Sequence, residues 1–435
     1  MFPGKSRPSR GHGLSLPLLR RFVGRHQYLA TASLFALAFA WFLITVAYPA
    51  SRQQTHGFGA YYSAARLLGQ GEISARIYDP AYFRPLVEAD SGGRASDIYN
   101  ANPPTTSLLL WPFVRFDIET ARAIWTGLSL LLLLAGVVLL VRAFAPQARA
   151  PITLFFSTIA LLFRPVIDNF RFGQAYVLVF FLLAVATVAF QRRRPGAGGL
   201  ALALALVLKT AGWPLLLLLL WLRRWRFLAW AVAGAGLILL FTLPLFPLSM
   251  WLRYARLLAE VTRSPLICVT AYQTTRSLFC HLFAPQTMWL EAPSLDLPAA
   301  AIATHAALGL SVLGMLLILA RRRATAAFVG VIAWSVLFAP LGEQYHHTVM
   351  LIPAFWLLGT WSRGEGGNWP AYTSLIAGLI AYITPYPIFH PRLQSGWWAL
   401  LAYPRLYGAW LILFALFLHL WATSLPVPVG RAGEV

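Results

Sequence analysis

The chain has 435 residues, of which 59% are hydrophobic and 11% are charged, and its mean hydropathy is +0.65. Soluble domains carry about 25% charged residues, so this chain has too little charge to cover a water-facing surface. The composition argues against a soluble enzyme, a disordered chain and a disulfide-stapled secreted domain, and it favours a polytopic membrane protein. The net charge of +21 would suggest nucleic-acid binding in a soluble protein, but in a membrane protein it indicates which side the basic segments occupy.

The N-terminal segment predicts a cytoplasmic tail followed by a retained anchor. Residues 1–27 are polar and basic, and no cleavable signal-peptide pattern occurs there. The apolar run that follows is long enough to span a bilayer. We therefore expect residues 1–27 to stay in the cytoplasm and the first span to remain in the membrane.

Apolar stretches along the chain predict an all-α protein of about twelve transmembrane helices, allowing short stretches where helices break. The Pro-rich segment 103–116 is too short to cross and is expected to be half-inserted. The stretch 151–163 is the weakest candidate, and the pair 197–211 and 212–222 is compatible with one broken or re-entrant hairpin. The predicted spans are 28–48, 118–142, 151–163, 174–190, 197–211, 212–222, 227–247, 299–320, 324–341, 345–361, 371–388 and 398–422.

Three arginine clusters test this topology. They are RRR at 192–194, RRWR at 223–226 and RRR at 321–323. They share one side of the membrane only if 197–222 turns back on itself, and the positive-inside rule assigns that side to the cytoplasm.

The same orientation predicts two large extracytoplasmic loops, 49–117 and 248–298, on the face where nearly all the acids lie. Since ionisable residues at a membrane are costly, their concentration on one face indicates one extracytoplasmic polar site. We expect a single domain over 28–422 in the plasma or inner membrane, with a cytoplasmic C-terminal tail at 423–435.

The first loop contains a predicted helix at 58–68. Its apolar and aromatic residues repeat every three or four positions, so one face is expected at the membrane interface. Gly69 and Gly71 are expected to end it.

The first loop carries two motifs, FGAYYSAARLLGQGEISARIYDPAYF (58–83) and NANPPTTSLLLWPF (100–113). Four weaker motifs follow in order, FGQAYVLVFFLLA (172–184), ALALVLKTAGWPLLLLLLWLRRWR (203–226), YQTTRSL (272–278) and FAPLGEQYHHTVMLIPA (338–354). Together and in this order, these segments resemble glycosyltransferase family 87 of the GT-C superfamily. The resemblance implies a GT-C-like fold and transfer of a sugar, mannose or arabinose, from a polyprenyl-phosphate donor to a lipid-linked or envelope glycan.

The implied donor is a substrate, and no cofactor, metal or nucleic acid is expected. The sequence contains no DxD pair, which disfavours a metal–diphosphate mechanism on nucleotide sugars. A lipid-phosphate donor needs a cationic group for its phosphate and a carboxylate that takes the proton of the acceptor hydroxyl.

Lys209 is the first candidate for the phosphate, because it is the only lysine after Lys5 and ends a predicted span. The alternative is a lysine that snorkels to the interface. The resemblance places His346 and His347 near the donor phosphate, although a polar cap on a helix is equally compatible with them. Tyr61 and Tyr62 of the first loop are also expected to bind substrate.

Two further residues are candidates with open alternatives. Arg276 in YQTTRSL could clamp phosphate or acceptor, or be a solvated loop arginine. Gln174 could line the cavity or cap a helix. Cys268 and Cys280 share the second outer loop, where a disulfide and two free thiols are both compatible with the sequence.

The catalytic base is where the chain departs from the family. Members commonly have Asp before the residue matching Phe58, but this chain has Gly57, preceded by His56. The candidates on the correct side are Glu343, which we place first, Asp79, Asp168 and His56. Asp79 is equally typical of an Asp-Pro turn, and Asp168 could pair with Arg164 or Arg171. A transporter or flippase of a lipid-linked sugar, or a catalytically altered family relative, is the alternative function.

Overall fold

The computed structural model describes residues 16–147, 150–263, 269–283, 295–365, 368–393 and 396–423. The regular structure of these residues is helical, and their one β-type contact is an isolated bridge between Tyr272 and Glu343. The predicted all-α fold is confirmed. Residues 1–15 and 424–435 of the predicted tails, and Cys268, lie outside the described residues.

Five helical segments are long and apolar enough to cross a membrane, so the protein is polytopic. They are His26–Arg52, α5 (Ile118–Phe144), α11 (Trp225–Thr242), α14 (Pro298–Ala320) and α18 (Pro404–Ala422). The first of them combines most of α1 (Leu16–Phe42) with η1 (Leu43–Ala47) and α2 (Tyr48–Arg52).

A sixth crossing is formed if two bent helices are one span. Helices α6 (Ala150–Leu162) and α7 (Arg164–Phe172) meet at an angle of 57°. The remaining apolar helices are shorter, so the number of twelve spans stays a prediction. They are α8 (Tyr176–Gln191), α9 (Pro195–Lys209), α10 (Pro214–Trp221), α15 (Ala324–Leu337), α16 (Leu351–Ser362) and α17 (Trp369–Ile383).

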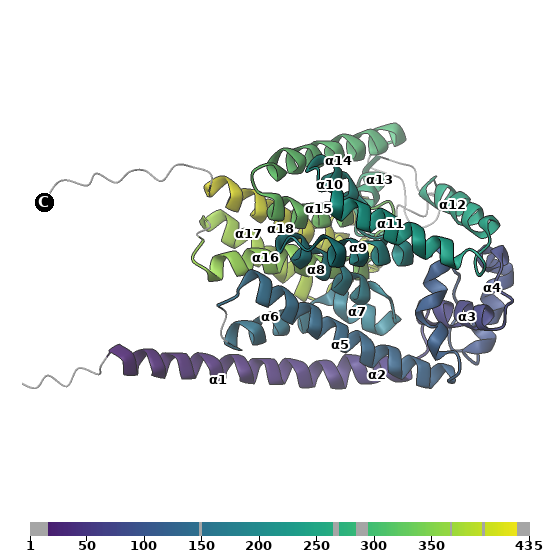
Figure 1. Ribbon diagram of the computed structural model, residues 1–435, viewed down its shortest axis with the longest axis horizontal. Coiled ribbons are helices and arrows are strands. Elements are labelled where there is room, and N and C mark those ends of the chain that lie inside the picture. The colour runs from purple at the N-terminus through teal and green to yellow at the C-terminus, as the bar shows by residue number, and fades with distance from the viewer. Residues whose placement is uncertain are drawn as a thin grey trace, which may run out of the picture.

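The helices pack into one bundle, in which α9 lies between α8 and α11 and α17 lies against α18 (Figure 1). Small residues permit the close approach of α9 to α11. A Cβ added to Gly198 would lie 2.4 Å from the ring of Phe227, and one added to Gly199 would lie 2.4 Å from Cβ of Trp230.

The three arginine clusters lie at one end of this bundle. Phe190 lies just before the first cluster, and its ring centre is 5.8 Å from the guanidinium of Arg224 in the second cluster. Trp221 lies just before the second cluster, and its ring centre is 4.6 Å from the guanidinium of Arg321 in the third cluster. A turn between α9 and α10 permits this, with Gly212 at φ +80°. The three clusters therefore lie at the same end of the bundle, and the hairpin formed by α9 and α10 explains why.

The first loop, residues 49–117, folds into a second core at one end of the bundle (Figure 1). Its elements are α3 (Phe58–Gly69), η2 (Ala75–Tyr78), α4 (Pro80–Asp90), η3 (Pro104–Leu109) and η4 (Trp111–Phe113). The helix predicted at 58–68 is present. Nearly all of its residues are buried, because α4 and the two 3-10 turns after it pack around it, so the expected interfacial face is absent.

The second loop contributes α12 (Leu248–Arg263), which packs on the first loop through Met250 and Tyr254. The other helical elements belong to the second loop and the C-terminal part. They are α13 (Thr275–Phe283), η6 (Gln344–Met350), η7 (Pro391–Leu393) and η8 (Gly396–Ala402).

Candidate active site

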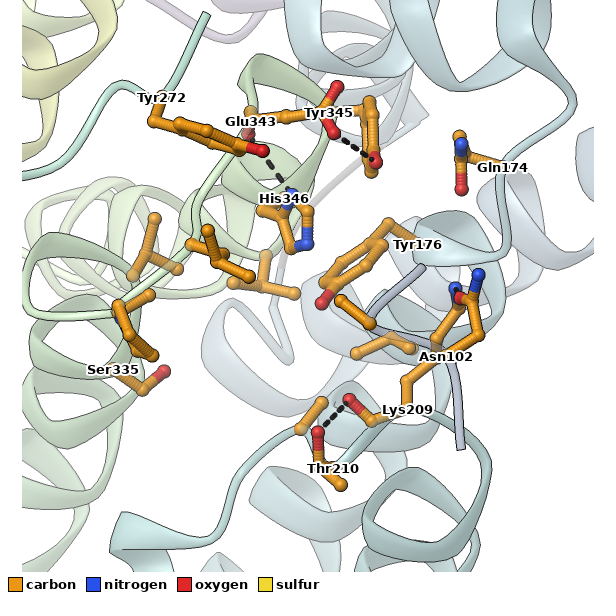
Figure 2. A pocket seen from close by; sticks show the side chains of 18 of the residues that line it. Asn102, Gln174, Tyr176, Lys209, Thr210, Tyr272, Ser335, Glu343, Tyr345 and His346 are labelled. Carbon is orange, nitrogen blue, oxygen red and sulfur yellow. Dashed lines mark hydrogen bonds between the residues drawn. The ribbon is translucent and has the colours of Figure 1, made fainter. Parts of the chain in front are cut away.

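A cavity of about 530 Å³ lies where the first loop meets the ends of α8, α9 and α15. This volume falls in the range of about 300–1,000 Å³ that is usual for small-molecule sites. One part of its wall is apolar and includes Trp213, Trp334 and Phe338. The other part is polar, with side chains from both the bundle and the loop (Figure 2).

Lys209, the last residue of α9, faces this cavity as the sequence predicts. Its ammonium donates to Tyr61 Oη at 2.5 Å and to Asn102 Oδ1 at 2.6 Å. The ion pairs found among the described residues do not include it. A half-buried cation that is hydrogen-bonded but not neutralised is suited to an anionic ligand.

A row of contacts connects Lys209 to the backbone of Gly57. Tyr61 accepts from Lys209 and donates its own hydroxyl proton to Gln174 Oε1. Gln174 lies against Gly57, since a Cβ added to Gly57 would be 2.5 Å from Gln174 Nε2 and 2.7 Å from the Phe172 carbonyl oxygen. Gly57 also has φ +84°, a backbone conformation that residues with a side chain rarely adopt. The close contacts and this conformation both exclude a side chain at position 57.

Asp97 places a carboxylate at this same position. Its Oδ2 accepts from the Gly57 N–H, and its Oδ1 accepts from the Ile98 N–H at 2.8 Å. Burial raises the pKa of the Asp97 carboxyl, and these two hydrogen bonds act in the opposite direction. Asp97 lines the cavity and was not among the sequence candidates. No local sequence pattern distinguishes Asp97 as a site residue, because acidic residues are common in polar loops.

Glu343 brings a second carboxylate from the opposite side, in the connection from α15 to η6. The Gln273 N–H donates to the Gly342 carbonyl at 2.8 Å, which ties this connection to the YQT segment. Gly342 permits the approach, because an added Cβ would lie 2.5 Å from Thr274. Glu343 Oε1 accepts from the Tyr345 hydroxyl at 3.0 Å, and burial raises the pKa of Glu343 to about 7.

Aromatic rings lie between Glu343 and Lys209 (Figure 2). The ring centres of Tyr345 and His346 are 4.6 Å apart, and those of His346 and Tyr176 are 4.0 Å apart. The Lys209 ammonium is 5.9 Å from the centre of the Tyr176 ring. The cation and the Glu343 carboxylate therefore occupy different ends of one polar wall, so a ligand can contact both.

Three predicted residues lie outside the cavity lining. Asp79 caps α4 by accepting from the Ala81 N–H at 3.0 Å. Asp168 is buried in α7 and pairs with Arg164 at 3.2 Å. Arg276 donates to the Thr262 carbonyl.

Two others make internal hydrogen bonds away from the lining. His347 is fully buried and bonds to Tyr382 Oη at 2.6 Å and the Gln273 carbonyl at 3.0 Å. The Tyr62 hydroxyl donates to the Phe116 carbonyl at 2.7 Å. Cys280 is disulfide-bonded.

Arg122 does not line the cavity but binds the backbone of segments next to it, and it was not among the site residues predicted from sequence. It is fully buried in α5 and donates to the carbonyls of Gln53 at 3.3 Å and Phe170 at 2.6 Å. Its neighbour Trp125 donates to the Gly173 carbonyl at 3.0 Å. Together they hold the turn that presents Gln174.

The comparisons with known proteins agree with the resemblance seen in the sequence. The model of glycosyltransferase family 87 matches residues 100–342, more than half of the chain. No curated protein and no solved structure gives a significant match. The matched region includes Gln174 and Lys209 and stops beside Glu343, while Asp97 precedes it by three residues. The chain belongs to glycosyltransferase family 87 and is a glycosyltransferase with several membrane-spanning helices.

Proposed function

We propose that the protein transfers a sugar, mannose or arabinose, from a polyprenyl-phosphate donor to a hydroxyl of a lipid-linked or envelope glycan. One observation carries the proposal. The unneutralised cation Lys209 shares a cavity with two carboxylates, Asp97 and Glu343, next to an apolar wall. A donor with an apolar tail, one anionic phosphate and a polar sugar needs all three surfaces.

In this proposal the donor phosphate binds at Lys209, and the tail leaves along the apolar wall. Trp213 is about half exposed and lies 6.2 Å, ring centre to ring centre, from Trp334. The sugar then extends towards Asn102 and the first outer loop. Lys209 stabilises the negative charge that develops on the leaving phosphate.

The chemistry is a direct displacement. The acceptor oxygen bonds to the anomeric carbon, the bond from that carbon to the phosphate oxygen breaks, and the electron pair leaves with the lipid phosphate. A carboxylate takes the acceptor proton, and attack opposite the leaving group inverts the anomeric centre. Asp97 is proposed as the base, because two backbone N–H groups hold its carboxylate in one orientation in the cavity wall. Glu343, the first choice from sequence, has its pKa raised to about 7 and is partly protonated at neutral pH.

The cavity is proposed to face the extracytoplasmic side. Helix α9 starts beside the 192–194 arginine cluster and ends at Lys209, so its 15 residues separate the two by about 22 Å. If the arginine clusters are cytoplasmic, the cavity opens at the outer leaflet of the cell membrane.

The test uses sealed vesicles that contain the protein, with polyprenyl-phosphate mannose or polyprenyl-phosphate arabinose labelled in the sugar. We expect the label to pass into a glycolipid fraction while free polyprenyl phosphate accumulates. Movement of intact donor across the bilayer without covalent transfer would contradict the proposal and favour a transporter.

A further inference from the structure

A second cavity of about 230 Å³ lies beside the first, between η2, the segment 98–100 and α12. Ile98 and Asn100 line both cavities. The second cavity is therefore separated from the proposed donor site by one short stretch of chain. That stretch directly follows Asp97, the proposed base.

The inner wall of this cavity is aromatic. It includes Tyr78 and Tyr99, whose ring centres are 5.7 Å apart. Their hydroxyls donate to the carbonyls of Asn102 at 2.9 Å and Pro103 at 3.2 Å. Because those polar ends are already bonded and the side chains are only 3% and 1% exposed, the wall contributes a small apolar contact for a ring-shaped ligand.

The rim of the cavity is polar but electrically balanced. Arg253 and Glu260 of α12 form an ion pair at 3.1 Å, with 38% and 57% of their side chains exposed. Asn100 adds a buried Oδ1 that has no hydrogen-bond partner. Such an atom is costly unless a ligand or water donates to it. The cavity thus combines hydroxyl-binding groups with no net charge.

We infer that this second cavity binds the terminal sugar of the acceptor, as one uncharged monosaccharide ring. The inference rests on the proposed function. The volume is below the range of about 300–1,000 Å³ that is usual for drug-sized ligands, so one ring is the size that suits it. The rest of the acceptor leaves past the exposed Arg253–Glu260 pair, and the reacting hydroxyl of the bound ring faces Ile98 and Asn100, which line both cavities.

The test fills the second cavity without touching the first. Leu257 lines only the second cavity, whereas its neighbour Leu258 lines the first. Leu257→Trp should lower sugar transfer to the membrane glycolipid acceptor by at least about tenfold, from the cost of overpacking. The affinity for polyprenyl-phosphate mannose should not change. Leu252→Trp is the matched control, because Leu252 lies on the same helix, is 50% exposed and lines neither cavity.

A second, more conservative variant controls for the possibility that Leu257→Trp misfolds. Glu260→Gln removes one side of the rim pair and should raise the half-saturating acceptor concentration several-fold while the maximal rate is retained. Full transfer activity in both Leu257→Trp and Glu260→Gln would overturn the acceptor site and leave the proposed function intact. If the wild-type protein transfers sugar from no lipid-phosphate donor, the proposed function fails, and the acceptor site fails with it.

Discussion

The two sides of the large cavity differ in origin. Lys209, Tyr176 and His346 come from the ends of the helical bundle, whereas Asp97 and Asn102 come from the first loop. A lysine at the end of an apolar helix is expensive in a membrane and so stands out in the sequence. An aspartate in a polar loop costs little and does not. The cation could therefore be predicted from sequence, whereas the loop carboxylate required the structure.

The largest effect on donor binding is expected on the bundle side. Lys209→Met should weaken binding of a polyprenyl-phosphate donor by about 100-fold or more, because a charge-assisted contact to phosphate is lost inside a poorly hydrated cavity. Donor affinity in nanodiscs is the measurement. Arg115→Met is the control, since Arg115 is an exposed cation of the first loop that does not line the cavity. Equal donor affinity in wild type and Lys209→Met would contradict the phosphate site.

The junction of the two sides should be sensitive to a single methyl group. Gly57→Ala should lower turnover by about 5- to 150-fold, because overpacking here costs about 1–3 kcal/mol and displaces Gln174 from Tyr61. Gly71→Ala is a matched control. Gly71 also has a positive φ, of +74°, but its added Cβ would meet no atom within 4 Å. Similar turnover in the two variants would show that backbone strain alone matters and would contradict the packing of Gln174 against Gly57.

The smallest effect concerns the charge of Glu343. Its carboxyl is neutral below a pKa of about 7 and negative above it, and the negative form repels the donor phosphate. Donor affinity should therefore fall several-fold between about pH 6 and pH 8 in the wild type, and Glu343→Gln should reduce this dependence. A rate at saturating donor that rises with an apparent pKa near 7, and is lost in Glu343→Gln, would instead identify Glu343 as the base.

Sequence patterns predicted the bundle better than the contacts between distant segments. Apolar length located α5 and α14 to within two residues, because a membrane span depends on local composition. The burial of α3 was not predictable, because α4 and the 3-10 turns that cover it are separate segments. Arg122 presented the same problem, since its carbonyl partners Gln53 and Phe170 are 69 and 48 residues away in the chain.

Within the candidate site, three of the predicted side chains that the structure brings together lie beside a local sequence signal. Lys209, Gln174 and Glu343 each lie at a helix end marked by Gly or Pro. The structure does not bring Asp79 and Asp168 to the site. The Asp79 carboxylate accepts from the Ala81 N–H, and the Asp168 carboxylate pairs with Arg164. A local turn or ion pair competes with a catalytic role, and only the fold decides between them.

The most direct test of sugar transfer in this cavity is the turnover of Asp97→Asn at saturating donor and acceptor. We expect a loss of about 10²- to 10⁴-fold, as is typical when a general base is removed, with donor affinity unchanged because Lys209 is intact. Asp97→Glu should recover part of the rate, since it restores the carboxylate. Wild-type turnover in Asp97→Asn would contradict the assignment of the base, and the same result in the Asp97→Asn/Glu343→Gln double variant would contradict carboxylate catalysis in this cavity.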